Sequence, residues 1–491
     1  MNRRQFLGGT AAIGAGLAGL YAWNRVDNFA YANIGKMPRL TMPKLLDATE
    51  SRTAKLVAQK GSSVFKEQAA NATFGFNQPY LGPTLRVSKG DFNPIIENQI
   101  PTPISVHWHG LLIPGAHDGG PHLPIAKGEE WAPKMQVDQP PATLWYHTHI
   151  HERTGHDVHK GLAGILQISD GRDDERGLPS DYGVDDLTLV LQDRRMDDQG
   201  FVSYQPAMPD YMHGFTGNAM LVNGQYGSVA VAPKSIVRLR LINGSNARIY
   251  ALHFEDERAF QLIATDSGYL ENPLMMTKLP LSPGERAEIL VDFSSGKPAL
   301  LKSDADPNQG PGGMMGNMMG RMRGMVDAVF DRSIDILPFV VDERVRPRIT
   351  KFADKLDAPA FNLRRGDVVK TRTFIMDLMG GTEGFSINNQ RFDMGRIDVD
   401  VALGSTEIWR VGSHMLAHPF HVHGAVFQVL SEGQSLPRPH NLGFKDTVLV
   451  GDEVELLIRF DHPASKEHPF MYHCHILEHE DAGMMGQFTV S

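Results

Sequence analysis

Residues 473–479 have the sequence His473-Cys474-His475-Ile476-Leu477-Glu478-His479, and Met484 follows five residues later. Successive side chains of a β-strand point to opposite faces. If this segment is a strand, Cys474 therefore points away from the face that His473 and His475 share. A single dipeptide step then connects two separate groups of metal ligands.

One of these groups has the composition of a blue-copper electron-transfer site. Such a site binds its ion with a thiolate, two imidazoles and a more distant thioether. Cys474, His479 and Met484 supply three of the four ligands, and we expect His479 on the turn after the strand. The second imidazole is predicted to be His418, because its spacing from His421 and His423 places it on the opposite face of a strand.

The other group is built from four pairs of the form His-x-His. Solvent-facing polar alternation explains one such pair in a chain with 21 His, but not four. Eight imidazoles exceed the needs of one tetrahedral zinc, and imidazole also suits copper, so a cluster of several ions is indicated. The pairs are His107/His109, His147/His149, His421/His423 and His473/His475.

Length and composition favour several β-rich domains. A chain of 491 residues exceeds the size of a single hydrophobic core. The 49 Gly and 31 Pro favour many turns between short strands. The formal net charge of −9 offers no basic surface for nucleic acid, so small molecules or metal ions are the expected partners.

Three runs alternate apolar with polar residues and predict half-buried strands: 84–87, 236–241 and 453–458. Long amphipathic helices are scarce, so the predicted class is all-β, with β-sandwiches joined by Greek-key connections. Within this pattern, the phrase at 281–289 resembles the strand entry at 451–455, which hints at internal repetition.

Charged, turn-rich stretches at 171–186 and 342–355 predict linkers between compact units. We therefore expect three domains, at 45–170, 185–341 and 356–491. The His-x-His pairs occur only in the first and third of these domains, so the cluster is predicted to form between them.

The N-terminus predicts export. Residues 1–32 contain Arg3-Arg4 followed by a short apolar, glycine-rich run, which resembles a twin-arginine signal peptide and is too short to span a bilayer. Cleavage near Ala30-Tyr31-Ala32 is expected, with an uncleaved anchor as the alternative. We expect a periplasmic or otherwise exported protein without stable membrane insertion. Cys474 is the only cysteine, so no intramolecular disulfide is possible.

Four motifs together resemble the copper signatures of the multicopper oxidases: His107-Trp108-His109-Gly110, His147-Thr148-His149, the run from His418 to Gly424, and the run from His473 to Met484. The resemblance implies three cupredoxin-like β-sandwich domains and four copper ions that reduce dioxygen to water. It implies a type 1 copper on His418, Cys474, His479 and Met484, a type 2 copper on His107 and His421, and a type 3 pair on His109, His147, His149, His423, His473 and His475.

Dioxygen reduction also consumes protons, and carboxylates near the cluster are the expected relays. By position in the resembling motifs these are Asp118 and Glu480. The alternative for Asp118 is a purely structural role, because it lies in an Asp-Gly-Gly-Pro sequence typical of a turn.

The electron donor is the open question, and the methionine-rich segment 310–325 bears on it. Its sulfur atoms, including those of Met314, Met318 and Met322, suit capture of Cu(I), while a featureless flexible loop is the alternative. The bacterial cuprous oxidases of copper tolerance also carry a methionine-rich segment. In those enzymes the segment lies in the third domain, whereas residues 310–325 belong to the predicted second domain of this chain. Met376, Asp377 and Met379 are further candidate ligands for substrate copper, or else buried strand positions.

We expect the chain to be a monomer. Three functions are considered for it. Cuprous oxidase comes first, and a laccase-like oxidase of phenols is the second. The third is a copper-free structural protein on the same fold, as some cell-division relatives are. Loss of ligands would mark that third case, whereas here every ligand position is filled.

Overall fold

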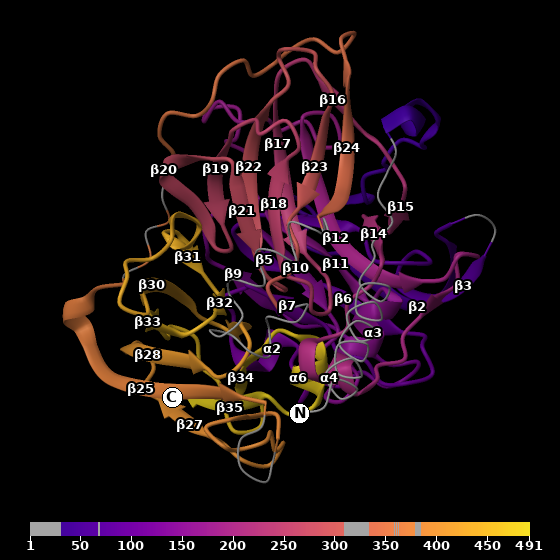
Figure 1. Cartoon of the computed structure of the whole chain (residues 1–491). Coiled ribbons are helices and arrows are strands. Elements are labelled where there is room, and N and C mark those ends of the chain that lie inside the picture. The colour runs from indigo at the N-terminus through magenta and orange to yellow at the C-terminus, as the bar shows by residue number, and fades with distance from the viewer. Residues whose placement is uncertain are drawn as a thin grey trace, which may run out of the picture.

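A computed structural model describes residues 31–66, 69–308, 333–357, 359, 361, 363–378 and 384–491. Strands dominate the described chain and its helices are short, which confirms the all-β prediction (Figure 1). Among the described residues, no helix has the length and apolar character needed to cross a membrane. Residues 1–30 of the predicted signal peptide lie outside the described part, and a short 3-10 helix, η1 (Tyr31–Lys36), follows them.

The first unit is a sandwich of two main sheets with a shared core. One sheet has the strand order β1-β4-β11-β10-β7, the other has the order β3-β2-β6-β8, and β5 pairs with β9. Side chains of both main sheets, such as Leu56 and Leu144, pack in one buried cluster. The elements are β1 (Leu45–Asp47), β2 (Lys55–Val64), β3 (Ala70–Phe76), β4 (Thr84–Val87), β5 (Gly90–Phe92), β6 (Ile95–Asn98), β7 (His107–His109), α2 (Gly115–Asp118), β8 (Glu130–Trp131), β9 (Met135–Val137), β10 (Ala142–His147), α3 (Thr154–Lys160) and β11 (Ala163–Ile168).

The second unit repeats this architecture with larger sheets. Their strand orders are β15-β14-β12-β17-β22-β19-β20, with β13 on the edge of β12, and β16-β24-β23-β18-β21. The elements are β12 (Asp186–Met196), β13 (Val202–Ser203), α4 (Met208–His213), β14 (Ala219–Val222), β15 (Gln225–Tyr226), β16 (Ala230–Pro233), β17 (Ile236–Asn243), β18 (Tyr250–Phe254), β19 (Phe260–Thr265), β20 (Gly268–Met276), β21 (Lys278–Leu281), β22 (Arg286–Asp292), β23 (Ala299–Ser303) and β24 (Ile334–Asp342).

The third unit has the strand orders β26-β25-β28-β33-β30-β31 and β27-β35-β34-β29-β32. Its core includes Trp409, Phe420 and Phe488. The elements are η2 (Arg365–Asp367), β25 (Val368–Asp377), β26 (Ser386–Ile387), β27 (Val399–Val401), β28 (Thr406–Ser413), β29 (His418–Val422), β30 (Val426–Glu432), η3 (Pro439–Asn441), β31 (Phe444–Lys445), β32 (Thr447–Val450), β33 (Glu453–Arg459), β34 (Phe470–Cys474), α6 (Leu477–Asp481) and β35 (Met485–Val490).

The hint of internal repetition has a structural counterpart. The order β12-β17-β22-β19 in the second unit matches β25-β28-β33-β30 in the third. In both, the first pair is parallel and the next two pairs are antiparallel. The two similar sequence phrases lead into β22 and β33, which occupy the same place in this order.

The strand predicted at 236–241 is wrong in one respect, because all of its residues are buried rather than half-buried. Its polar face carries Arg238 and Arg240, which form ion pairs with Glu288 and with Asp186. Charged partners from neighbouring segments therefore cover the face that the alternation predicts to be exposed.

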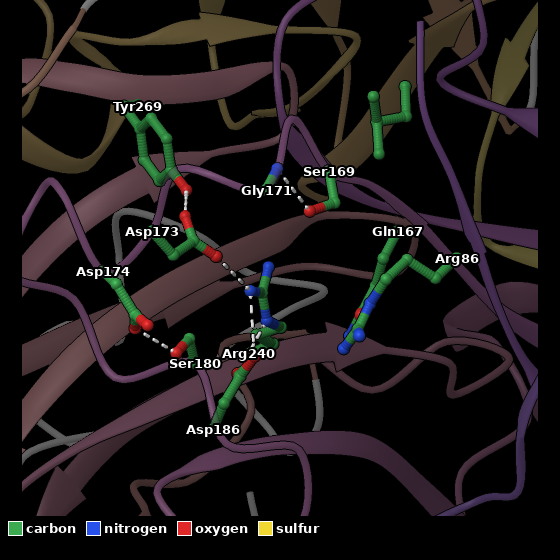
Figure 2. Close-up of a pocket in the computed structure, with 11 residues that line it drawn as sticks. Arg86, Gln167, Ser169, Gly171, Asp173, Asp174, Ser180, Asp186, Arg240 and Tyr269 are labelled. Atoms are coloured by element: carbon green, nitrogen blue, oxygen red, sulfur yellow. Dashed lines mark hydrogen bonds and ion pairs between the residues drawn. The ribbon is translucent and has the colours of Figure 1, made fainter. Parts of the chain in front are cut away.

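The segment predicted as the first linker packs closely against the second unit. Asp173 accepts a hydrogen bond from the Tyr269 hydroxyl at 2.6 Å and one from Arg238 at 3.0 Å, and it lies 3.5 Å from a nitrogen of Arg240. Figure 2 shows Asp173, Tyr269 and Arg240 around a polar cavity of about 180 Å³ that Arg86 of the first unit also lines. The junction between the first two units is thus charged and packed, while the predicted domain limits stay predictions.

Candidate metal centre

The predicted histidine pairs lie on or directly beside neighbouring strands of the first and third units. In the first unit, β7 pairs with β10 and places His107 opposite His147. In the third, β29 pairs with β34 and places His421 opposite His473. Because side chains at alternate strand positions share a face, each strand pair presents its imidazoles on one side.

The eight imidazoles meet between these two units, as the sequence predicts. None is more than 1% exposed. The rings of His107 and His423 stack at 3.7 Å between centroids, and so do those of His109 and His421. The Nε2 atom of His473 lies 3.2 Å from that of His149 and from that of His423, and the Nε2 atoms of His107 and His421 are 3.4 Å apart.

The chemistry of this cluster fits metal ions. Burial lowers the pKa of the His147, His149, His423 and His475 imidazoles well below the usual value of about 6.5, so they are neutral and offer lone pairs at neutral pH. Within the described chain, Nε2 of His147 and both ring nitrogens of His475 have no hydrogen-bond partner. Buried nitrogens without partners are costly, and metal ions of the imidazole-binding class would satisfy them.

The predicted type 1 ligands also come together, in a second buried group. The Sγ atom of Cys474 lies 3.5 Å from Nδ1 of His418 and 3.7 Å from Nδ1 of His479, and the Met484 sulfur lies 3.1 Å from Nδ1 of His418. Burial raises the pKa of the Cys474 thiol, so a bound metal ion would favour the thiolate that burial alone disfavours.

His479 lies on α6 rather than on the predicted turn. This one-turn helix begins two residues after His475, and the backbone amide of Ile476 donates a hydrogen bond to the Cys474 sulfur at 3.4 Å. The helical turn brings His479 back to the sulfur, which a strand could not do. The alternation of side chains along a strand predicts the position of His418. It does not apply to His479, because that residue lies on a helix.

Asp118 ends α2 in place of the predicted turn, and it contacts two of the histidines. Its Oδ2 atom accepts a hydrogen bond from Nδ1 of His423 at 2.7 Å, and its backbone oxygen accepts one from Nδ1 of His107 at 3.0 Å. Its other carboxylate oxygen is buried without a partner among the described residues. The side chain therefore faces the cluster instead of bonding only to its own turn.

Glu480 on α6 contacts two other imidazoles of the cluster. Its carboxylate oxygens lie 3.4 Å from Nδ1 of His149 and 3.2 Å from Nδ1 of His473. Burial by itself raises the pKa of Glu480, but its contacts with these two histidines outweigh burial and hold the pKa below the usual range. Both predicted relay carboxylates thus contact imidazoles of the cluster.

Two buried carboxylates at the site have no place in the sequence prediction. Asp446 lies 3.1 Å from Nε2 of His109, and its backbone oxygen accepts a hydrogen bond from His421 at 2.9 Å. Glu478 accepts hydrogen bonds from the Tyr204 hydroxyl and the Asn246 amide, and burial raises its pKa to about 7. Glu478 directly precedes the predicted ligand His479, whereas Asp446 lies in no motif that the sequence singles out.

The candidate substrate residues are more dispersed. Met376 is fully buried in the core of the third unit, which matches the alternative of a buried strand position. Asp377 is partly exposed, and its carboxylate lies 3.4 Å from Nδ1 of the exposed His414, four positions before His418. Residues 310–325, including Met314, Met318 and Met322, and also Met379, lie outside the described residues.

Comparisons with known proteins agree with the geometry. Three sequence models, each described as multicopper oxidase, match residues 57–173, 186–299 and 361–491. A relative from Dickeya dadantii (strain 3937), named cell division protein FtsP, is 35% identical over 494 residues, which cover 100% of this chain and 98% of the relative.

Two solved structures share the fold over most of this chain. One is a bacterial laccase-like multicopper oxidase, CueO, from Ochrobactrum sp., with oxidase activity towards lignin model compounds and lignosulfonate. It is 41% identical with a TM-score of 0.83, and the match covers 92% of this chain and 100% of that one. The other is a laccase from Pediococcus acidilactici, 30% identical with a TM-score of 0.80, covering 96% of both chains.

Proposed function

Because this chain belongs to the multicopper oxidase family, we propose that it is an enzyme that oxidises one-electron donors and reduces dioxygen to water. The observation that carries the proposal is the completeness of the ligand set. Ten histidines, one cysteine and one methionine occupy every ligand position of the family motifs, and they gather in two buried groups.

The proposed metal content is four copper ions. One would be held by His418, Cys474, His479 and Met484, one by His107 and His421, and a pair by His109, His147, His149, His423, His473 and His475. When bound, copper supplies one-electron redox chemistry, which accepts electrons singly from the donor and delivers four of them to one dioxygen.

The chain itself would connect the two groups and manage the protons. Cys474 is covalently joined to His473 and His475, so its backbone is the shortest path between the two ligand groups. Asp118 and Glu480 contact different imidazoles of the cluster, where each could pass on some of the four protons that two water molecules require.

Cu(I) is the first candidate donor. The thioethers in residues 310–325 are soft ligands that select Cu(I). The exposed His414 and the nearby Asp377 also offer ligands close to the type 1 group. A phenolic donor is the alternative, supported by the relative from Ochrobactrum sp. that acts on lignin model compounds.

A role in cell division is the second candidate function. It is supported by relatives named cell division protein FtsP that are 33–35% identical over nearly the whole chain. The two functions differ in what they require of Cys474. If a division defect in a strain lacking this protein is corrected by a Cys474→Ser variant, the division role does not depend on oxidation.

Copper loading and oxygen uptake test the enzymatic proposal. The purified full chain is reconstituted with copper, its metal content is counted, and oxygen consumption is followed with Cu(I) and with a methoxyphenol. We expect four ions per chain and turnover with at least one donor. A copper-loaded protein that consumes no oxygen with either donor would contradict the proposal.

Export is proposed separately, on the twin-arginine sequence at Arg3-Arg4. We expect the double variant Arg3→Lys, Arg4→Lys to accumulate in the cytoplasm, as fractionation of cells would show. Equal export of the double variant and the parent protein would contradict the twin-arginine route.

A further inference from the structure

The second unit carries no metal-ligand motif, yet one of its side chains reaches the wall of the histidine cluster. We propose that Arg286 is a positioning residue of the oxygen-reducing centre. It would hold Asp446 against His109 so that this imidazole offers its Nδ1 atom to metal. The inference rests on the proposed function for its catalytic meaning, and it can be tested on copper binding alone.

The contact chain runs from Arg286 through Asp446 to two histidines. Arg286 begins β22 and binds Asp446 with two parallel hydrogen bonds of 2.6 and 2.5 Å. The Oδ1 atom of Asp446 lies 3.1 Å from Nε2 of His109, and the hydroxyl of Thr447 donates to the same oxygen at 2.8 Å. The Asp446 backbone oxygen accepts a hydrogen bond from His421.

This arrangement selects one tautomer of His109. An ionised carboxylate only accepts hydrogen bonds, so the Nε2 atom of His109 must carry the proton and donate it to Asp446. The Nδ1 atom then keeps its lone pair, and it is buried without a hydrogen-bond partner among the described residues. His109 also belongs to a group of potential ligands with His107 and His147, toward which Nδ1 remains available.

Arg286 is the counter-charge of the Asp446 carboxylate. The guanidinium meets both carboxylate oxygens, at 2.6 and 2.5 Å, in the paired geometry of a buried arginine–carboxylate ion pair. Both residues are at most 1% exposed, so water contributes little to stabilising either charge. Without Arg286, a buried carboxylate would lose its main counter-charge, and its hold on His109 would weaken.

The guanidinium itself is fixed by all three units. Besides its two bonds to Asp446, it donates to the backbone oxygens of Thr143 at 3.3 Å, Gly284 at 3.0 Å and Asp266 at 3.1 Å. These bonds use all five N–H groups of an arginine. Lysine has three donors on a single nitrogen and cannot reproduce this pattern.

Two glycines make room for the contact. A Cβ on Gly110, whose φ is +91°, would lie 2.6 Å from Nη2 of Arg286 and 2.8 Å from Oδ2 of Asp446. A Cβ on Gly284, whose φ is +84°, would lie 2.8 Å from the ring of His475. The turn before β22, singled out in the sequence as a repeated phrase, therefore packs directly on the cluster.

The decisive test compares Arg286→Lys with the parent, using the full chain loaded with copper. Loss of a residue that orients a metal ligand typically weakens metal affinity by about 10–100-fold. We expect a loss of that size for cluster copper, measured by competition with a chelator, together with an altered type 2 signal in electron paramagnetic resonance. The blue absorption of the Cys474 site should be unchanged.

The matched control is Arg238→Lys, which also alters a buried arginine–carboxylate pair of the second unit, with Glu288. It should leave both copper signals unchanged. Unchanged cluster affinity and resonance in Arg286→Lys would overturn the inference, and so would equal loss in the control.

Asp446→Asn provides a second variant in case Arg286→Lys does not fold. It should weaken cluster copper in the same way, and the double variant should lose little more than either single one, because the residues act as one unit. Additive losses would overturn the inference. If the parent binds copper but does not turn over, the proposed function fails, while these binding measurements still decide the role of Arg286.

Discussion

The Oδ2 atom of Asp118 lies 2.7 Å from Nδ1 of His423, so a carboxylate of the first unit orients an imidazole of the third. The backbone oxygen of the same residue accepts a hydrogen bond from His107 of its own unit. One residue thus holds two histidines that come from different units of the chain.

Asp118→Asn should slow oxygen reduction without loss of the blue absorption. The amide oxygen can still accept the hydrogen bond from His423, but an amide does not relay protons at neutral pH. Because proton transfer by a positioned side chain contributes at least about 100-fold, we expect kcat to fall by roughly that factor. Asp138→Asn, at an exposed carboxylate of the same unit, is the control. An unchanged rate in Asp118→Asn would refute the relay role.

Glu480→Gln should have a similar effect. The carboxylate contacts His149 and His473, and these contacts hold its pKa below the usual range, so it is ionised at neutral pH. We expect kcat for oxygen uptake to fall by about 100-fold, with copper content and blue absorption retained. The role is excluded if Glu480→Gln turns over like the parent.

Cys474→Ser should remove the intense blue absorption and turnover together. The sulfur is the central atom of the second ligand group, within 3.7 Å of both imidazole nitrogens. A hydroxyl is a poor substitute for a soft thiolate. Met484→Leu, which removes only the thioether that would bind copper weakly, should keep the blue colour. Oxidase activity that survives in Cys474→Ser would contradict the proposed electron path.

Deletion of residues 310–325 should separate the two candidate donors. If the methionines capture Cu(I), kcat/KM for Cu(I) should fall while kcat/KM for a phenol stays unchanged or rises. Both values are measured on the deletion variant and on the parent at equal copper content. Equal Cu(I) oxidation by the two proteins would end the copper-capture hypothesis.

The copper-free protein should lose stability as the pH falls below about 6.5. Burial lowers the pKa of His418 to about 3 and that of His421 to about 4. Between those values and 6.5 the unfolded chain binds protons that the folded chain does not. The stability of the folded state is therefore present above 6.5 and is lost on acidification, by up to about 1.4 kcal/mol per histidine and pH unit.

Urea unfolding of the copper-free protein at pH 7.5 and pH 5.5, values chosen to bracket the free imidazole pKa, measures this effect. Replacement of His418 and His421 by Gln should make the dependence less steep, because the other buried histidines still contribute. Equal free energies of unfolding at the two pH values would show that these imidazoles are not held neutral by burial.

Sequence by itself determined the fold class and gathered the ligands. The four His-x-His pairs, the single cysteine inside one of them and the spacing of His418 from another pair follow the two-residue period of a strand. They can therefore be recognised before the fold is known. Prediction from local patterns was wrong where contacts with distant segments change the burial of a strand. The strand at 236–241 is buried on both faces because Glu288 and Asp186 pair with its arginines.

Only the tertiary structure decided that Asp446 and Arg286 join the predicted carboxylates Asp118 and Glu480 at the cluster. Arg286 and Asp446 are 160 positions apart in sequence, and no periodic pattern relates them. Their contact exists because three β-sandwiches meet at the cluster. A buried charge there needs a partner from whichever unit is nearest in space rather than in sequence.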